Sequence, residues 1–238
     1  ICALTSGYDD LRERIGDIVV GWKKDGTTPV TAREIKGIGS IMALLRDAIK
    51  PNLAQTAEGQ PTIVHMGPFG NIAHGCSSII ADKLAVNCGE YVITEAGFGA
   101  DLGFEKFMDI KVRQGGPKPS AAVVVATIRG LKWHGGVPLK EMATANPDAV
   151  RKGAENLKNA LRIVGLYGLP AVVAINRFPT DSAEEIAVVK EVAMAAGAIG
   201  VEEAKGFAEG GDGMIDLANA VVEAADQPSD VKLLYEDD

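Results

Sequence analysis

The sequence predicts an α/β fold in which mainly parallel β-sheets are flanked by helices. Short runs rich in Val and Ile, without polar alternation, are typical of strands buried on both faces. Longer stretches with helical signals separate these runs, and such alternation favours a parallel sheet. The four apolar runs are residues 62–65, 91–94, 122–126 and 171–175.

The N-terminal stretch predicts a helix followed by a β-hairpin. Residues 1–16 have a helical pattern, with a charged segment from Asp9 onward. Residues 17–22 and 29–30 are expected to form two short strands around a turn at Asp25-Gly26, because Asp-Gly is a typical hairpin turn.

A second helix is expected after this hairpin. Thr31 is a suitable N-cap, and Glu34 stands three residues later, as in a capping box. The helix is expected to run to about Ile49 and to stop before Pro51, since the residue before proline disfavours helical geometry.

The remaining helices are marked by caps and glycine stops. Asn146 and Pro147 predict the start of one long helix, and Gly168 its end. The segment 180–182 precedes another helix that should end near Gly197. The full set of helices expected beyond the second one covers residues 77–86, 104–112, 146–167, 183–197 and 214–225.

Regular patterning is lost for about ten residues near 135–138. We therefore predict two domains: residues 1–136, the C-terminal part of a nucleotide-binding domain, and residues 137–238, a second α/β domain. The chain starts without Met and without a clear helix start, and it ends without a stop signal. We expect it to be an internal piece of a longer protein.

Composition and charge exclude several classes of partner. The net charge is −8 and the basic residues are scattered, whereas a nucleic-acid interface needs a concentrated positive face. No stretch is long enough to span a membrane, and no signal peptide is present. The three cysteines include no CxxC pair, which favours a reducing, cytoplasmic compartment without a zinc site.

Two glycine-rich segments follow predicted strands. Residues 66–78 open a helix, and amides at such a junction attract anions; the alternative is a tight turn that needs glycine for geometry alone. Residues 94–103 contain Glu95 and Asp101, a carboxylate pair suited to Mg²⁺ or to orienting a water. The alternative is that Asp101 caps a helix and Glu95 forms a salt bridge.

Two further segments lie at the ends of the later strands. After residues 122–126, Arg129, Lys132 and His134 offer donors suited to phosphate or carboxylate, or else they are solvated surface cations. After residues 171–175, the Asn176 amide is suited to reading the edge of a base or pterin. The alternative at this second position is a plain helix cap by the nearby Asp181.

Some motifs are absent from the 238 residues. The sequence contains no GxxxxGK[ST] phosphate loop, no GxGxxG fingerprint after a strand and no nucleophile elbow. The three histidines are too dispersed to indicate a metal cluster.

The same segments carry a family resemblance. The strings GPFGNIAHGCSSIIADK, TEAGFGADLGFEKFMDIK, VATIRGLKWHGG and AINRFPTD resemble, in this order, those of the formate–tetrahydrofolate ligases. The third string departs at Gly130, where the family pattern leads us to expect Ala, and Trp133 is an unusual residue there. Neither departure removes a polar group.

The resemblance implies a P-loop-NTPase-like parent fold and an ATP-dependent ligase. ATP, Mg²⁺, formate and tetrahydrofolate are the implied ligands, formyl phosphate is the implied intermediate, and 10-formyltetrahydrofolate is the implied product. The loop with Phe69, Gly70, Asn71 and His74 is implied to line the formyl phosphate pocket. The residues implied near the nucleotide and along the cleft are Glu95, Asp101, Arg129 and Asn176.

The resemblance also places the phosphate loop upstream of residue 1. We therefore expect negligible ligase activity from these residues alone. The alternative reading is a catalytically inactive fragment or degenerate paralogue that only binds a ligand or a partner. We also expect self-association, or association with missing segments, because exposed strand edges and apolar faces favour it.

Overall fold

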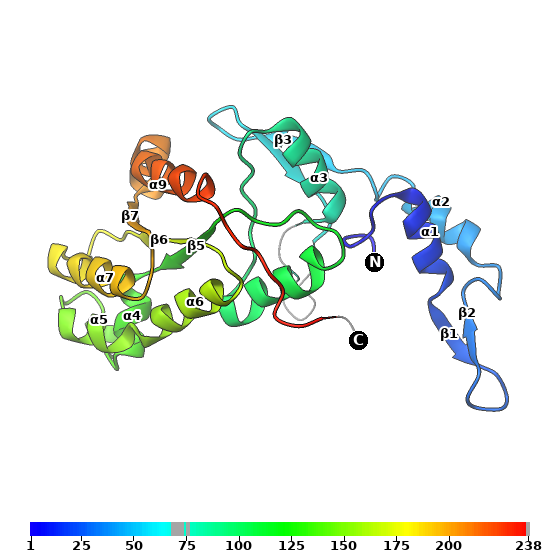
Figure 1. The fold of residues 1–238 in the computed structure, drawn as a ribbon, viewed down its shortest axis with the longest axis horizontal. Coiled ribbons are helices and arrows are strands. Elements are labelled where there is room, and N and C mark those ends of the chain that lie inside the picture. Colours follow the sequence, from blue (N-terminus) through cyan, green and yellow to red (C-terminus); the bar gives the residue numbers. More distant parts are fainter. Residues whose placement is uncertain (68–73, 75–76, 237–238) are drawn as a thin grey trace. The chain divides into compact units, whose positions relative to one another are not determined.

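The computed structural model describes residues 1–67, 74 and 77–236, which divide into two compact units. One unit comprises Ile1–Gly97 and Glu105–Pro117; the other comprises Phe98–Phe104 and the chain from Lys118 onward. The elements of both units are labelled in Figure 1. The predicted division into domains at residue 136 stays a prediction about the parent protein.

The first unit opens with the predicted helix and hairpin. Helix α1 covers Tyr8–Gly16, and β1 (Val19–Trp22) pairs antiparallel with β2 (Pro29–Thr31). Helix α2 covers Ile38–Leu45. The two helices bury one apolar cluster between them, formed by Leu11, Ile15, Ile38, Met42 and Ile49.

The helix predicted with Thr31 as its N-cap begins six positions later than expected, at Ile38. The predicted capping contacts do form, since the Thr31 amide donates to Glu34 Oε2 at 2.9 Å and the Glu34 amide to Thr31 Oγ1 at 3.4 Å. They close a turn rather than a helix, because Lys36 adopts a left-handed φ of 58°, which interrupts helical geometry.

The apolar run at 62–65 was predicted as a parallel strand, and this is wrong. Strand β4 (Pro61–Val64) pairs antiparallel with β3 (Asn52–Gln55) in a hairpin. The connecting turn has Gly59 at a φ of 92°, a conformation that glycine adopts without steric cost. A hairpin of this length brings the two strands together locally, so no crossover helix is needed.

The prediction of a strand at 91–94 is also wrong. These residues are irregular and exposed, and Ile93 is 89% exposed. They form no strand and belong to none of the described sheets. The neighbouring α3 (Ile79–Cys88) is as expected, and Ser78 caps it by accepting the Ala81 amide at 3.0 Å.

The helix predicted at 104–112 is present in a wider form. Two π-helical segments, η1 (Ala100–Phe104) and η2 (Phe107–Val112), lie on either side of Glu105 and Lys106. In the first unit, buried Lys111 of η2 pairs with Asp82 of α3, and its ammonium lies 4.3 Å from the Phe107 ring centroid. This charged contact ties η2 to α3.

The second unit contains the parallel sheet that the sequence predicted. Strands β5 (Ala122–Ala126), β6 (Ala171–Asn176) and β7 (Gly200–Ala204) are ordered β5-β6-β7, and both pairs are parallel. Strand β7 was not expected. Its sequence GVEEA contains two carboxylates and a single large apolar side chain, which suits an edge strand rather than a buried run.

Helices cover both faces of this sheet (Figure 1). Val172 and Ala174 of β6 pack against Leu217 and Ala224 of α9. Because side chains alternate along a strand, the intervening side chains of β6 point to the other face, on the side of α6 and α7. The remaining helices of the unit are α4 (Ile128–His134), η3 (Leu139–Glu141), α5 (Pro147–Gly153), α6 (Glu155–Leu166), α7 (Ala183–Ala195), α8 (Gly206–Glu209), η4 (Gly210–Met214) and α9 (Ile215–Ala225).

Helix α4 was not among the helices expected from the sequence. Thr127 directly follows β5 and caps α4, accepting the Gly130 amide at 3.0 Å. Gly135 and Gly153 allow α4 to pack closely on α5. A Cβ on Gly135 would overlap the Ala149 carbonyl, and one on Gly153 would overlap the Leu131 carbonyl.

Candidate functional site

Three segments leave the β5-β6-β7 sheet at its carboxyl edge. Ala126 of β5 is in register with Ile175 of β6, and Asn176 is in register with Ala204 of β7. All three strands are parallel, so the segments that follow them leave the sheet at the same edge. Ligands of open parallel sheets bind at this kind of edge.

Two of these segments meet through Arg129 and Phe178. The Arg129 guanidinium carbon lies 4.6 Å from the centroid of the Phe178 ring, within the range of a cation–π contact. Arg129 is exposed in the first turn of α4, and Phe178 is half-buried in the loop after β6. The pair presents a planar cation and an aromatic ring at one place.

The loop after β6 is held by its own polar contacts. The Phe178 amide donates to Asp181 Oδ2 at 2.8 Å, and Arg177 Nη2 donates to the Asp181 carbonyl at 3.4 Å. Arg177 also pairs with Glu203 of β7. These contacts restrict the backbone on both sides of Phe178 and join the loop to the neighbouring strand.

Two polar atoms of this loop are buried without a hydrogen-bond partner among the described residues. They are Arg177 Nε, a donor, and Asp181 Oδ1, an acceptor. Buried polar atoms of native proteins are nearly always paired with protein or water. A water or a polar ligand atom would satisfy each of them.

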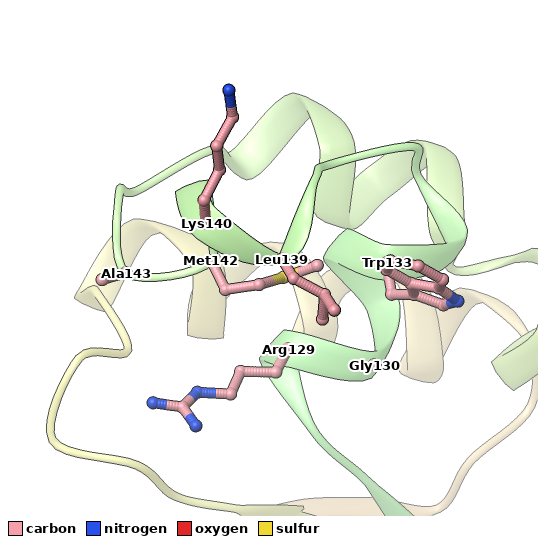
Figure 2. A pocket seen from close by; sticks show the side chains of 7 residues that line it. All are labelled: Arg129, Gly130, Trp133, Leu139, Lys140, Met142 and Ala143. Carbon is pink, nitrogen blue, oxygen red and sulfur yellow. The ribbon is translucent and has the colours of Figure 1, made fainter.

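A groove of about 440 Å³ borders Arg129 on the outer side of α4. Figure 2 shows Leu139 and Met142 between the Arg129 and Trp133 side chains, while Lys140 extends away from Arg129. The groove is lined by Arg129, Gly130, Trp133, Leu139, Lys140, Met142 and Ala143. Arg129 is thus shared between this apolar groove and the Phe178 contact.

A fully buried ion pair underlies the edge. Lys132 Nζ lies 2.8 Å from Glu185 Oε1, and neither side chain has any exposure. Burial raises the pKa of Glu185, but hydrogen bonds from Lys132 and from the backbone amides of Ser182 and Asn146 outweigh it, so that the pKa lies below its ordinary value. Glu185 is therefore ionised at neutral pH.

The structure places the predicted site residues in different parts of the chain. Phe69, Gly70 and Asn71 lie outside the described residues. His74, at 6% exposure, and the exposed Glu95 belong to the first unit.

The other three predicted residues, Asp101, Arg129 and Asn176, are exposed and belong to the second unit. The carboxyl edge of the sheet brings Arg129 and the Asn176 segment together, through the contact with Phe178.

The described histidines do not form a metal centre. In the described residues, no group of three or more His, Cys, Asp or Glu side chains could hold a metal ion. His65 is buried, and its ring nitrogens lie 2.7 Å from Ser78 Oγ and 3.0 Å from the Ala48 carbonyl. Since a carbonyl only accepts, Nε2 donates to Ala48, and His65 links β4 to α3 as a structural residue.

Sequence reasoning proposed Lys132 as a donor to phosphate or carboxylate or as a surface cation, and both are wrong because Lys132 is fully buried against Glu185. It assigned no role to Arg177, Phe178 or Glu185. For Glu185 a signal existed, because Ser182 stands three residues before it. The structure shows the full capping box, with the Ser182 amide donating to Glu185 Oε2 at 2.9 Å. No local sequence pattern indicates that Lys132 pairs with Glu185 of α7.

Comparison with known proteins decides the family. The family model described as formate–tetrahydrofolate ligase matches residues 1–238. This chain belongs to the formate–tetrahydrofolate ligase family. The predicted resemblance is confirmed.

Curated formate–tetrahydrofolate ligases from three bacteria are similar to this family member. That of Roseiflexus sp. (strain RS-1) is 53% identical over 243 residues, covering 99% of the chain. Those of Desulforamulus reducens and Saccharopolyspora erythraea are 48% and 49% identical over 245 residues, covering 100% of the chain. The chain spans 43% of the length of each of these relatives.

No described helix of this formate–tetrahydrofolate ligase family member combines the length and the apolar character needed to cross a bilayer.

Proposed function

We propose that the protein containing this chain joins formate to tetrahydrofolate at the expense of ATP. The observation that carries the proposal is the family match over residues 1–238. A formate oxygen attacks the γ-phosphorus of ATP, and ADP leaves, which gives formyl phosphate. The folate amine then attacks the formyl carbon and loses its proton, and phosphate leaves with the oxygen that came from formate. The product is 10-formyltetrahydrofolate.

The second unit supports a nucleotide or pterin subsite at the carboxyl edge of its sheet. Phe178 offers an aromatic face that is suited to stacking on a planar heterocycle. The exposed Asn176 amide carries both a donor and an acceptor for the edge of such a ring. The Arg129 guanidinium is suited to stabilising negative charge on a transferring phosphoryl or formyl group.

For the other predicted residues the proposal rests on the family alone. Phe69, Gly70, Asn71 and His74 would line the formyl phosphate pocket. Glu95, in the first unit, and Asp101, in the second, are exposed carboxylates. Carboxylate oxygens are ligands that Mg²⁺ prefers, so each by itself is suited to a metal or nucleotide contact. Mg²⁺ bound to ATP would neutralise phosphate charge. Because Mg²⁺ keeps several waters, it requires few protein ligands.

Isotope tracing tests this chemistry in the full-length protein that carries the sequence. With ATP, Mg²⁺, tetrahydrofolate and ¹⁸O-labelled formate, we expect 10-formyltetrahydrofolate, ADP and labelled phosphate in equal amounts. Phosphate without label would contradict the formyl phosphate route. No formate-dependent product would contradict the ligase proposal and favour a protein that only binds ligands or partners.

We further propose a cytoplasmic location and association of the chain with itself or with other segments of its parent. Among the described residues, exposed apolar side chains occur on edge strand β5, where Val123 is 42% and Val125 66% exposed. An unpaired edge with apolar side chains favours pairing with another segment. Light scattering on the 238-residue chain should therefore show association, and a monodisperse monomer would contradict it.

A further inference from the structure

We infer that the buried Lys132–Glu185 ion pair is a positioning device, which sets Arg129 against Phe178 at the carboxyl edge of the sheet. The inference rests on the proposed function for its kinetic consequences. Its structural consequence, the restraint on the Phe178 loop, is independent of that function. Lys132 and Glu185 are positioning residues, since neither reaches the edge itself.

The pair joins three segments of the second unit. Lys132 Nζ, on α4, donates to the Thr144 carbonyl at 3.2 Å as well as contacting Glu185. Glu185, at the start of α7, accepts the Asn146 amide through Oε1 and the Ser182 amide through Oε2, each at 2.9 Å. Helix α4, the 144–146 segment and helix α7 are therefore joined by directional hydrogen bonds.

Each end of the pair is close in sequence to one member of the stacked contact. Lys132 stands three residues after Arg129 on α4, so it is one helical turn away. On the other side, Ser182 directly follows Asp181, whose carboxylate holds the Phe178 amide. A shift of α4 relative to α7 would therefore change how Arg129 lies on Phe178.

A contribution to the stability of the fold does not by itself explain why a buried ion pair occupies this position. Removing two charges from water is expensive, and apolar residues of similar volume are often as stable or more stable. An apolar contact is non-directional and lets helices slide, whereas three hydrogen bonds and an ion pair define one arrangement. The geometry therefore favours a positional role.

The variants remove the charges while keeping the volume. Lys132→Met leaves Glu185 as a lone buried carboxylate and should lower the melting temperature most. Adding Glu185→Gln removes that charge, so K132M/E185Q should recover part of the loss. The matched control is R151M/E191Q, which neutralises an exposed pair between α5 and α7 with an Nη2–Oε2 distance of 2.6 Å. This control should leave kcat/KM and the hydrogen-exchange rate of the Phe178 amide unchanged.

In the full-length protein we expect K132M/E185Q to lower kcat/KM by about tenfold or more, as misplaced groups do, despite its recovered melting temperature. The decisive test is coupling with Arg129→Ala. If the pair acts through Arg129, its loss should add little in the R129A background. Full additivity, or kinetics that recover together with stability, would overturn the inference.

Hydrogen exchange in the 238-residue chain tests the same inference without any activity. The Phe178 amide should exchange about tenfold faster or more in K132M/E185Q, through local opening. Unchanged exchange at Phe178 would overturn the inference. If the wild-type full-length protein lacks ligase activity, the ligase proposal fails, and this measurement still decides the positioning role.

Discussion

Arg129 and Phe178 come from segments that follow two adjacent parallel strands, and the guanidinium carbon lies 4.6 Å from the centroid of the Phe178 ring. The contact combines a charge that is suited to phosphate with a ring that is suited to a heterocycle. Substitution of either residue therefore tests the proposed site in the second unit most directly.

Arg129→Lys should lower kcat/KM of the full-length protein about tenfold or more, because lysine keeps the charge but loses the planar stack and the forked donors. Steady-state kinetics with ATP as the varied substrate measure this. Arg162→Lys is the matched control, because Arg162 is an exposed residue of α6. This variant should behave as wild type. Wild-type kinetics for R129K would mean that the stacked geometry is unimportant.

Glu185 predicts a loss of stability in acid. Its pKa is lowered in the folded state, so its contribution is fully present above its ordinary value of 4.5 and is lost as the pH falls through the lower folded value. Glu185→Gln should unfold more easily at neutral pH by about 3 kcal/mol, since it leaves Lys132 buried without an anion.

Urea titrations between neutral pH and pH 3 measure the Glu185 effect. The difference between wild type and E185Q should shrink as the pH falls below 4.5. A difference that stays constant with pH would contradict the ionised state of Glu185 in the folded protein.

Asp10 predicts a second acid-sensitive contact, in the first unit. A hydrogen bond from the Ser6 amide, helped by bonds from Arg14 and Thr5, lowers its pKa from 3.8 to about 2. Asp10→Asn should therefore destabilise the chain above about pH 4, and its difference from wild type should fade towards pH 2. Thermal melts across this range measure it, and equal melting temperatures at pH 6 would count against the contact.

Gly153→Ala should destabilise the second unit by about 3 kcal/mol, because the added methyl would overlap the Leu131 carbonyl and force α4 from α5. Gly165→Ala is the matched control. It lies inside α6 with nothing within 4 Å of the added methyl, so it should stabilise by up to about 1 kcal/mol. Denaturant unfolding compares them, and similar stabilities for the two variants would contradict the close α4–α5 packing.

Local signals in the sequence predicted β5, β6 and several helices of the second unit, but not α4 or β7. Strands β5 and β6 are apolar runs, of which β6 is buried, and helices such as α7 start at the expected caps. Because parallel strands share an edge, placing Arg129 and Asn176 after two such runs was enough to expect them at one edge. The stack with Phe178 needed the strand register, which no local pattern contains.

Long-range pairing explains the errors. Residues 62–65 and 91–94 have the composition of buried strands, but composition does not reveal the partner strand. The first run formed a local hairpin, and the second forms no strand. Likewise, Lys132 and Glu185 lie on helices far apart in sequence, and only the packing of α4 against α7 brings the two charges together.

Formate-dependent release of ADP by the full-length protein, in the presence of tetrahydrofolate, tests the central claim most directly. Membership of the ligase family predicts ADP and 10-formyltetrahydrofolate in equal amounts, with a strong decrease for Arg129→Ala. ATP cleavage that is independent of formate, or no cleavage by a folded full-length protein, would contradict the account.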